Sequence, residues 1–218
     1  MSFNLSSSSA RSPAPEEKRL ERSVVAFSQP KLFNFKRSEN LHSRRSDGLW
    51  RIQSGYVRSL TWNSEGEPVP LGFWSKGDIV GDVALQRNDA VISQGSYYQV
   101  QCLTAVSAEY LGKPHDCLQS VMLAQLSQSN DLLKIAHCRQ SEQRLLKFIC
   151  WIANLFGEPT LQGRRIPIKL THQEISESIG STRVTVTRFL KILERDGKIS
   201  WTAHERIVYK DTFEQLEA

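Results

Sequence analysis

Residues 170–195, LTHQEISESIGSTRVTVTRFLKILER, carry the side chains whose types and spacing could do the most specific chemistry in this chain. Their pattern is typical of two short helices joined by a tight turn. At about 100° per residue, the second helix separates an apolar face from an edge rich in hydrogen-bond donors. The apolar face comprises Val186, Phe189, Leu190 and Leu193, and the opposite edge comprises Arg183, Val184, Thr187, Arg188 and Lys191. Because one face can pack while the other hydrogen-bonds to nucleic acid, we interpret the segment as a DNA reader.

A glycine marks the turn between the two expected helices. Gly180 can take positive φ without a Cβ clash, and either Ser181 or Thr182 can then cap the second helix. The residues expected to pack between the helices are Ile175 and Ile179, with the small Ser176 allowing a close crossing. The alternative is an amphipathic surface helix that only solvates its charges. The combination of cap, glycine turn and paired apolar faces favours the DNA reader.

The rest of the chain must position this segment. Its 218 residues have room for two domains, and 39% hydrophobic with 23% charged residues is ordinary for a soluble globular protein. The net charge is only +5, but residues 164–198 hold eight Lys or Arg against four Asp or Glu. Neither an apolar run of roughly 20 residues nor a signal-peptide core is present, so a cytoplasmic protein without a membrane segment is expected.

Four cysteines are scattered through the sequence without a CxxC pair. This spacing argues against a zinc ribbon, an iron–sulfur cluster or a disulfide framework, and favours reduced, buried thiols. His115 and Cys117 could form a metal site with His137 and Cys138 if the two segments met, but such spacings arise easily by chance. We therefore expect no cofactor and no metal.

From Val24 to about Leu111, short β-branched and aromatic runs alternate with turn signals, which predicts an antiparallel barrel or sandwich. The runs are LWRIQSG at 49–55, YVRSLTW at 56–62, VPLGFW at 69–74 and YYQVQCLTAVSAEYL at 97–111, with turns at 63–68 and 75–78. Between His115 and Phe156 the apolar spacing becomes helical and predicts two helices. The apolar stripe of the first, within residues 116–138, could pack on the barrel or meet its own copy as a coiled-coil seam.

Beyond these helices, RRIPIKL at 164–170 is predicted to be a strand, GKISWTAHERIVYK at 197–210 two strands of a wing, and DTFEQLEA a short acidic helix. The expected division is a disordered tail at 1–23, a β-domain at 24–114, a linking and dimerisation helix at 115–138 and a DNA-binding domain at 139–218. The fold class is therefore α+β, with an antiparallel β-roll, a long linking helix and a winged helix-turn-helix.

With these parts in this order, residues 24–210 resemble the Crp/Fnr family of bacterial transcription regulators. Two stretches carry the resemblance: IQSGYVRS followed by KGDIVGD, and LTHQEISESIGSTRVTVTRFLKILERDGKI. Within the second, GSTRVTVTR is similar to the recognition helix of the cyanobacterial nitrogen regulator branch. The resemblance implies a cyclic-nucleotide-binding-like β-roll and a homodimer on double-stranded DNA, at a palindromic operator with half-sites related to GTA and TAC. RNA polymerase is a candidate partner.

The resemblance also suggests roles for individual side chains. Arg183 and Arg188 are expected at base edges, because a guanidinium can donate two hydrogen bonds to the O6 and N7 of guanine. Val184 would touch a thymine methyl where relatives of the cyclic-AMP receptor type place a carboxylate. The residues expected near phosphates are Thr171, His172, Gln173, Ser181 and Thr185. Thr182, Thr187 and Lys191 complete the candidate DNA contacts, and Thr171 is equally well explained as a helix cap.

The family's effector contacts are harder to find. Gly81, Asp82 and Val83 are the candidate effector residues, but a turn of the fold explains them equally well. A cyclic-nucleotide pocket needs an Arg for the phosphate, but Ile92 and Ser93 align where that Arg and its hydroxyl neighbour should lie. Arg87 could replace the missing Arg from a shifted loop, but an arginine in a solvated turn is the favoured interpretation. The nitrogen regulator branch senses 2-oxoglutarate, but its two arginines align with Ser96, ahead of Tyr97 and Tyr98, and with Gln125. A different effector, or none, is expected.

The sequence contains no recognisable catalytic motif. The chain has neither a Gly-rich phosphate loop nor a GxSxG elbow, so we do not expect an enzyme. The main alternative is a protein-interaction module built on a winged helix and a β-roll, and a small-molecule enzyme comes third. A regulator without an effector, controlled by its own abundance, remains a fourth hypothesis.

Overall fold

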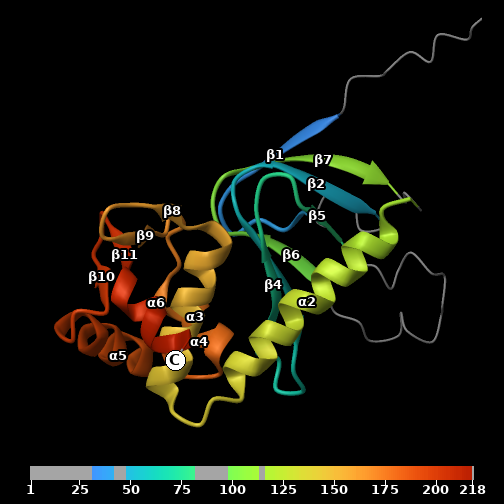
Figure 1. Ribbon diagram of the computed structural model, residues 1–218. Coiled ribbons are helices and arrows are strands. Elements are labelled where there is room, and N and C mark those ends of the chain that lie inside the picture. The colour runs from blue at the N-terminus through green and yellow to red at the C-terminus, as the bar shows by residue number, and fades with distance from the viewer. Residues whose placement is uncertain (1–30, 42–47, 82–97, 113–115, 218) are drawn as a thin grey trace, which may run out of the picture.

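The computed structural model describes residues 31–41, 48–81, 98–112 and 116–217. A β-roll, a long helix and a helical unit with its own small sheet follow one another along the chain (Figure 1). This order and the antiparallel pairing confirm the predicted α+β class. The tail expected at 1–23 lies outside the described residues, and the exact boundaries of the expected domains stay predictions.

Two antiparallel sheets form the β-roll, with the strand orders β1-β7-β2-β5 and β4-β3-β6. The strands are β1 Leu32–Phe35, β2 Leu49–Ser54, β3 Val57–Trp62, β4 Pro68–Trp74, β5 Ile79–Val80, β6 Gln99–Cys102 and β7 Val106–Gly112. The predicted runs at 49–55, 56–62 and 69–74 are confirmed as β2, β3 and β4. The run at 97–111 contains two strands in different sheets, because residues 103–105 bend the chain between β6 and β7.

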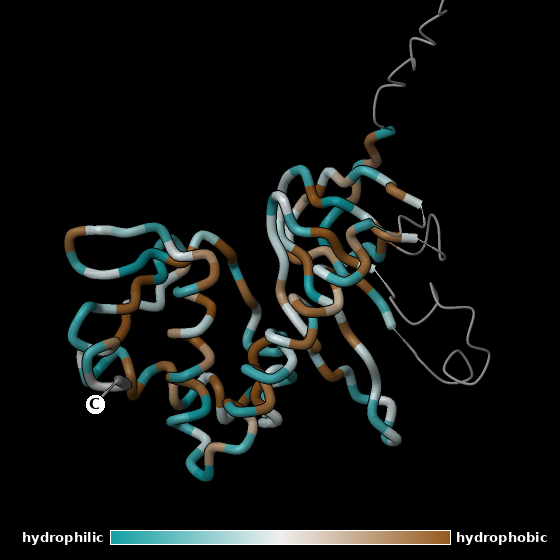
Figure 2. Tube along the Cα trace, turned by 45° about the vertical axis from the view of Figure 1, so that its right-hand side comes forward, coloured by the Kyte–Doolittle hydropathy of each residue, from teal (hydrophilic) through white to brown (hydrophobic). Residues whose placement is uncertain are grey.

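Alternating side chains of the two sheets fill the β-roll. Trp50, Ile52, Val57 and Val100 are fully buried there. Hydrophobic stretches of the chain gather inside the roll and where the helices meet, with hydrophilic stretches mainly on the outer loops (Figure 2). This core supports two segments that lie next to the helices: the turn after β1 and the β3–β4 hairpin.

Helix α2, Leu118–Ala136, runs along the β-roll and packs against β4 (Figure 1). Its Val121, Leu132 and Ile135 are buried. The exposed large apolar side chains of the same helix are Met122 at 42%, Leu123 at 59%, Leu126 at 58% and Leu133 at 57%. The β-roll thus covers only part of the apolar stripe of α2. Packing within the chain is confirmed for the buried side chains, and pairing of the exposed side chains with a second copy stays a prediction.

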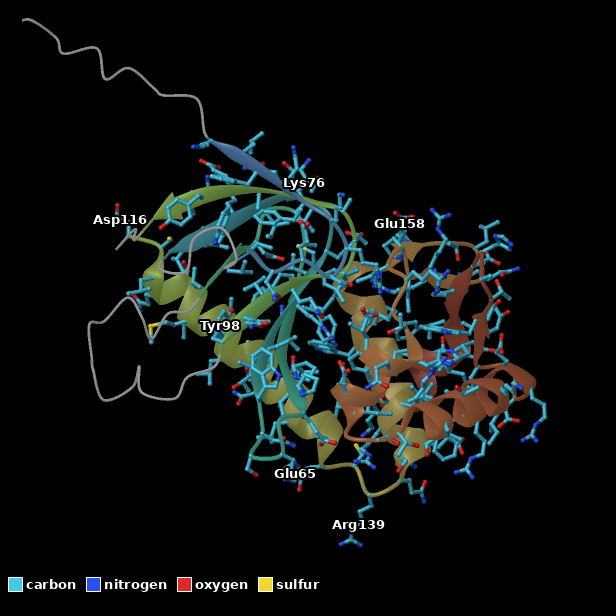
Figure 3. The ribbon with its side chains drawn as sticks, turned by 180° about the vertical axis from the view of Figure 1, so that it is seen from behind. Glu65, Lys76, Tyr98, Asp116, Arg139 and Glu158 are labelled. Carbon is cyan, nitrogen blue, oxygen red and sulfur yellow. The ribbon has the colours of Figure 1, made fainter. Side chains whose placement is uncertain are left out.

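The C-terminal unit holds the helix-turn-helix and a four-stranded antiparallel sheet with the order β10-β11-β9-β8. Its elements are α3 Ser141–Phe156, β8 Glu158–Pro159, β9 Gly163–Arg165, α4 His172–Ile179, α5 Arg183–Arg195, β10 Ile199–Trp201, β11 Arg206–Tyr209 and α6 Lys210–Glu217. The predicted wing and terminal helix are confirmed. Figure 3 shows the extent of this unit, with Glu158 near one end and Arg139, in the α2–α3 connection, pointing outward at the other.

The strand predicted over 164–170 is wrong beyond Arg165, where β9 ends. One more hydrogen bond, from Ile166 N–H to Arg206 O at 2.8 Å, continues the pairing. The next residue is Pro167, which has no N–H to donate, so the ladder stops there. Ile166, Ile168 and Leu170 are nonetheless buried, which explains the strand-like alternation in a segment that is not a strand.

A continuous apolar core joins the β-roll to the C-terminal unit. Phe73 of β4 packs edge-on against Phe148 and Trp151 of α3, with ring centroids 5.8 Å apart in both pairs. An ion pair lies beside this core, between Arg58 of β3 and Glu177 of α4, with N and O 2.7 Å apart. The side chain of Arg58 is only 5% exposed, so this pair is largely removed from water. Helix α4 is therefore held by the β-roll as well as by its own domain.

Candidate nucleic-acid interface

Helix α4 begins with a capping box. The Thr171 hydroxyl accepts a hydrogen bond from the Glu174 N–H at 3.1 Å, and the Glu174 carboxylate accepts one from the Thr171 N–H at 2.6 Å. This exchange satisfies two backbone donors that the first turn of a helix leaves unpaired. The cap expected at Thr171 is confirmed. Glu174 is absent from the sequence-based candidates, although the T-x-x-E spacing indicates it.

The turn between α4 and α5 has the expected geometry. Gly180 adopts the left-handed conformation at φ 56°, and Ser181 N–H donates to the carbonyl of Ser176 at 3.0 Å. Of the two candidate caps of α5, it is Thr182 whose hydroxyl accepts the N–H of Thr185, at 3.2 Å. Ser181 instead borders a cleft of about 460 Å³ between α4, the C-terminal half of α2 and the β3–β4 hairpin.

Helix α5 has the two faces that its sequence predicts. The apolar side chains Val186, Leu190 and Leu193 are buried against the rest of the unit, together with Ile175 and Ile179 of α4. The residues exposed along the opposite edge are Arg183, Val184, Arg188 and Lys191. Val184 is 78% exposed, which is unusual for an apolar side chain on a folded helix and leaves its methyl groups free to touch a partner.

Thr187 and Thr185 are less free than the sequence suggests. The Thr187 hydroxyl donates to the carbonyl of Arg183 at 2.9 Å and also contacts His172 Nδ1 at 2.7 Å. Because the hydroxyl hydrogen is directed to Arg183, Nδ1 of His172 is assigned as the donor of the second bond. The Thr185 hydroxyl shares a 2.9 Å hydrogen bond with the Thr182 hydroxyl. These contacts link α4 to α5 and brace the start of α5.

An open cleft of about 480 Å³ lies at the start of α4, lined by Thr171, His172, Gln173 and Arg183. It brings three of the expected phosphate-binding residues together with one of the expected base-reading residues. Burial lowers the pKa of His172, and the nearby Arg183 guanidinium lowers it further. The cleft thus combines a helix N-terminus with an arginine and an imidazole, an arrangement suited to an oxyanion such as a phosphate.

The wing is tied to α5 by Glu194, a residue absent from the sequence-based candidates. The Glu194 carboxylate accepts a hydrogen bond from the N–H of Trp201 in β10 at 2.9 Å. The contact spans the DG turn at Asp196–Gly197, where Gly197 has φ 67°. Since Glu194 lies on α5 itself, it fixes where the wing sits relative to the exposed edge of that helix.

Of the three expected effector residues, Gly81 alone lies within the described part of the chain. Gly81 is buried at φ 154°, and a Cβ there would lie 2.7 Å from the Leu49 side chain, so this position serves close packing. Gly81 borders neither of the two clefts described above. Asp82, Val83, Arg87, Ile92, Ser93, Ser96 and Tyr97 lie outside the described residues. Tyr98 packs partly buried against the β-roll core, and Gln125 is half-buried on α2.

The cysteines form no disulfide. Cys102 and Cys150 are buried, and burial raises the pKa of each thiol to about 12, as expected for inert apolar filler. Cys117 and Cys138 are only half-buried, so the prediction of buried thiols is wrong for these two.

Among the described residues, no three His, Cys, Asp or Glu side chains gather as metal ligands, and His115 lies outside them. No helix in the described ranges is long and apolar enough to cross a bilayer.

Known proteins similar to this chain are regulators of transcription. Residues 143–218 match the family model of the Crp-like helix-turn-helix domain. The chain is 38% identical over 156 residues to the regulatory protein CysR of Synechococcus elongatus, which covers 69% of this chain and 71% of that relative. It is 31% identical over 173 residues to the global nitrogen regulator of Synechocystis, in a match that covers 75% of this chain and 77% of that relative.

The fold agrees with these similarities. A CRP/FNR-family transcriptional regulator from Thermus thermophilus matches the structure with a TM-score of 0.65, at 20% identity, over 86% of this chain and 99% of that chain. At this identity the match supports the fold alone, whereas the matches to CysR and the nitrogen regulator extend over most of both sequences. The chain therefore belongs to the Crp/Fnr family of DNA-binding transcription regulators.

Proposed function

We propose that this protein reads a two-fold symmetric DNA operator as a homodimer. The observation that carries the proposal is the exposed edge of α5, where Arg183, Val184, Arg188 and Lys191 project from a helix whose opposite face is buried. A helix docked in this way can enter the major groove without unfolding any of its own contacts. No effector forms part of the proposal, and the protein is placed in the cytoplasm with the DNA; RNA polymerase stays a candidate partner.

Two arginines would read bases. Arg183 and Arg188 can each donate a pair of hydrogen bonds to the O6 and N7 of guanine, and Val184 can contact a thymine methyl. The guanidinium carbon of Arg188 lies 4.9 Å from the ring centre of Phe189, a contact that limits its freedom before binding. The expected half-sites are related to GTA and TAC.

Side chains around the start of α4 would hold the phosphates. Thr171, His172 and Gln173 border the open cleft that Arg183 completes. Phosphate contacts of this kind set the register of the protein on the duplex and carry no sequence information themselves. The remaining candidate contacts are Ser181, Thr182, Thr185, Thr187 and Lys191, of which the bound hydroxyls of Thr185 and Thr187 would act mainly by bracing α5.

The exposed stripe of α2 would pair two copies. Met122, Leu126 and Leu133 follow one another at spacings of four and seven residues, as core positions of a coiled coil do. Pairing along this stripe would remove large apolar side chains from water and place two α5 helices in successive major grooves, about 34 Å apart.

Selection of bound sequences from a random duplex library tests the proposal. The wild-type protein should select palindromes with a fixed half-site spacing, whereas Arg183→Ala and Arg188→Ala should lose base preference while staying folded and dimeric. Arg195→Ala is the matched control, because Arg195 is exposed on the same helix but pairs with Asp196. Unchanged selection by both arginine variants would refute the assignment.

Two further measurements separate the rival explanations. Affinity for DNA should fall steeply as salt rises, because phosphate neutralisation releases counterions. If no salt-dependent binding to any duplex is found, the protein-interaction module is favoured instead. The double variant Leu126→Glu, Leu133→Glu should sediment as a monomer and lose the preference for palindromes, and a wild-type monomer would contradict the proposed dimer.

A further inference from the structure

Arg37 lies in the turn after β1 and reaches across to the helix-turn-helix. One guanidinium nitrogen donates to the Leu103 carbonyl of its own domain and to the Lys169 carbonyl, the latter at 3.2 Å. The other nitrogen lies 2.7 Å and 2.9 Å from the two carboxylate oxygens of Glu174. Arg37 therefore joins the β-roll, the segment leading into α4 and the first turn of α4 through one side chain.

The Glu174 carboxylate occupies a sensitive place. It accepts the N–H of Thr171, next to the cleft lined by Thr171, His172, Gln173 and Arg183. Its side chain is only 12% exposed, so water screens its charge weakly. A carboxylate stabilises the N-terminus of a helix, but it repels a phosphate that approaches the same end. The capping box thus places a negative charge where the proposed DNA contact needs a positive potential.

We propose that Arg37, although it belongs to the β-roll, supports DNA binding by neutralising Glu174 at the phosphate-facing end of α4. The inference rests on the proposed DNA contact at that end. Without Arg37, Glu174 would keep its capping role and present an uncompensated charge to the backbone of the duplex. With Arg37 in place, the first turn of α4 keeps both its cap and its attraction for an anion.

This arrangement makes DNA affinity depend on how the two domains sit together. Leu103 and Arg37 belong to the β-roll, whereas Lys169 and Glu174 belong to the DNA-binding unit. Any displacement that separates Arg37 from Glu174 uncovers the carboxylate and weakens phosphate binding, even if α5 itself is unchanged. The contact is therefore a route by which the state of the β-roll reaches the DNA interface.

Three variants of the full chain test the proposal, measured as affinity for a duplex that the wild-type protein selects. Arg37→Gln should lower the affinity about two- to fivefold, because one negative charge near a helix N-terminus is uncovered. Glu174→Gln should raise it by a similar factor, because Gln can keep the capping box while the charge of Arg37 becomes available. The double variant, with no net change in charge, should bind like the wild type.

Because the two single variants should change DNA affinity in opposite directions, they distinguish charge compensation from a simple structural contact. If the pair only holds the domains together, both single variants would weaken binding and the double variant would not recover; this result, or no change in either single variant, would overturn the inference. Lys36→Gln removes the same charge from the exposed neighbouring residue and should have a smaller effect. The differences should shrink as salt rises. A wild-type protein that binds no duplex would refute the proposed function itself, whereas duplex binding without opposite signs refutes only the role of Arg37.

Discussion

The side-chain amide of Gln128 pairs with both backbone polar groups of Phe73. The Phe73 N–H donates to Oε1 of Gln128 at 2.6 Å, and Nε2 of Gln128 donates to the Phe73 carbonyl at 2.8 Å. The same residue packs its ring against Phe148 and Trp151 of α3. Phe73 therefore holds α2 with its backbone and the DNA-binding unit with its side chain, which makes β4 the element that joins all three parts.

Replacing this amide should destabilise the protein. Gln128→Leu would leave two backbone groups of Phe73 without their partners, and an unpaired buried polar group costs about 1–3 kcal/mol. We expect the free energy of unfolding in urea to fall by about 2–4 kcal/mol. Gln119→Leu is the control, because Gln119 is exposed near the start of the same helix. Equal effects of the two variants would show that the amide pairing contributes nothing specific.

The ion pair between Arg58 and Glu177 offers a second test of the joint between the domains. Arg58 also donates from Nε to the side-chain oxygen of Gln101 at 2.9 Å, so its guanidinium has partners on both β6 and α4. Removing one partner of a buried pair leaves the other uncompensated, and Arg58→Met should destabilise the fold by about 3–5 kcal/mol. The double variant Arg58→Met, Glu177→Leu should recover part of that loss in the same denaturation assay. Recovery of nothing would mean that Arg58 acts through packing and not through charge.

The sequence predicts the helix-turn-helix of the DNA-binding unit closely. The α4–α5 pair is determined locally: Gly180 sets the turn, Thr171 and Thr182 supply the caps, and the helical period separates buried from exposed residues. All of these signals lie within one short segment. In the same unit the strand expected at 164–170 is mostly wrong, because Ile166, Ile168 and Leu170 alternate for reasons of burial while Pro167 ends the ladder.

The contacts between domains could not be read from the sequence in this way. Arg37 and Glu174 are far apart along the chain, as are Arg58 and Glu177, and nothing in their local patterns marks them as partners. The split stripe of α2 has the same origin, since only the position of the β-roll decides that Leu132 is buried and Leu133 exposed. Long-range pairing depends on the assembled fold.

The conformation of Gly180 gives a local test at the turn. At φ 56° a Cβ is strained, although the nearest atom to it would be a nitrogen of Arg144 at 3.9 Å, so space is not the problem. Gly180→Ala should therefore lower the stability by about 1 kcal/mol, and the cost should come from the backbone. Gly180→Asn should cost less, because Asn tolerates the left-handed region. If Ala and Asn were equally harmful, crowding and not φ would be the cause.

His172 should make both stability and DNA affinity depend on pH, in opposite directions. Burial, and then Arg183, holds its pKa in the folded protein below the ordinary value of 6.5. Below pH 6.5 the unfolded chain therefore binds more protons at His172 than the folded protein does. The contribution of His172 to stability is complete above pH 6.5 and should be lost as the pH falls from there through the folded-state pKa. Thermal unfolding from pH 7.5 down to about pH 5 should show this slope in the wild type.

Binding of DNA should reverse the preference of the same imidazole. A phosphate in the cleft at the start of α4 favours the protonated ring, so the pKa of His172 should rise in the complex and binding should take up a proton. Affinity for an operator duplex should thus increase as the pH falls over the range in which the fold weakens. His172→Gln should remove the contribution of this residue to both slopes. If the variant keeps the pH dependence of DNA affinity but loses that of stability, His172 braces Thr187 without approaching the phosphate.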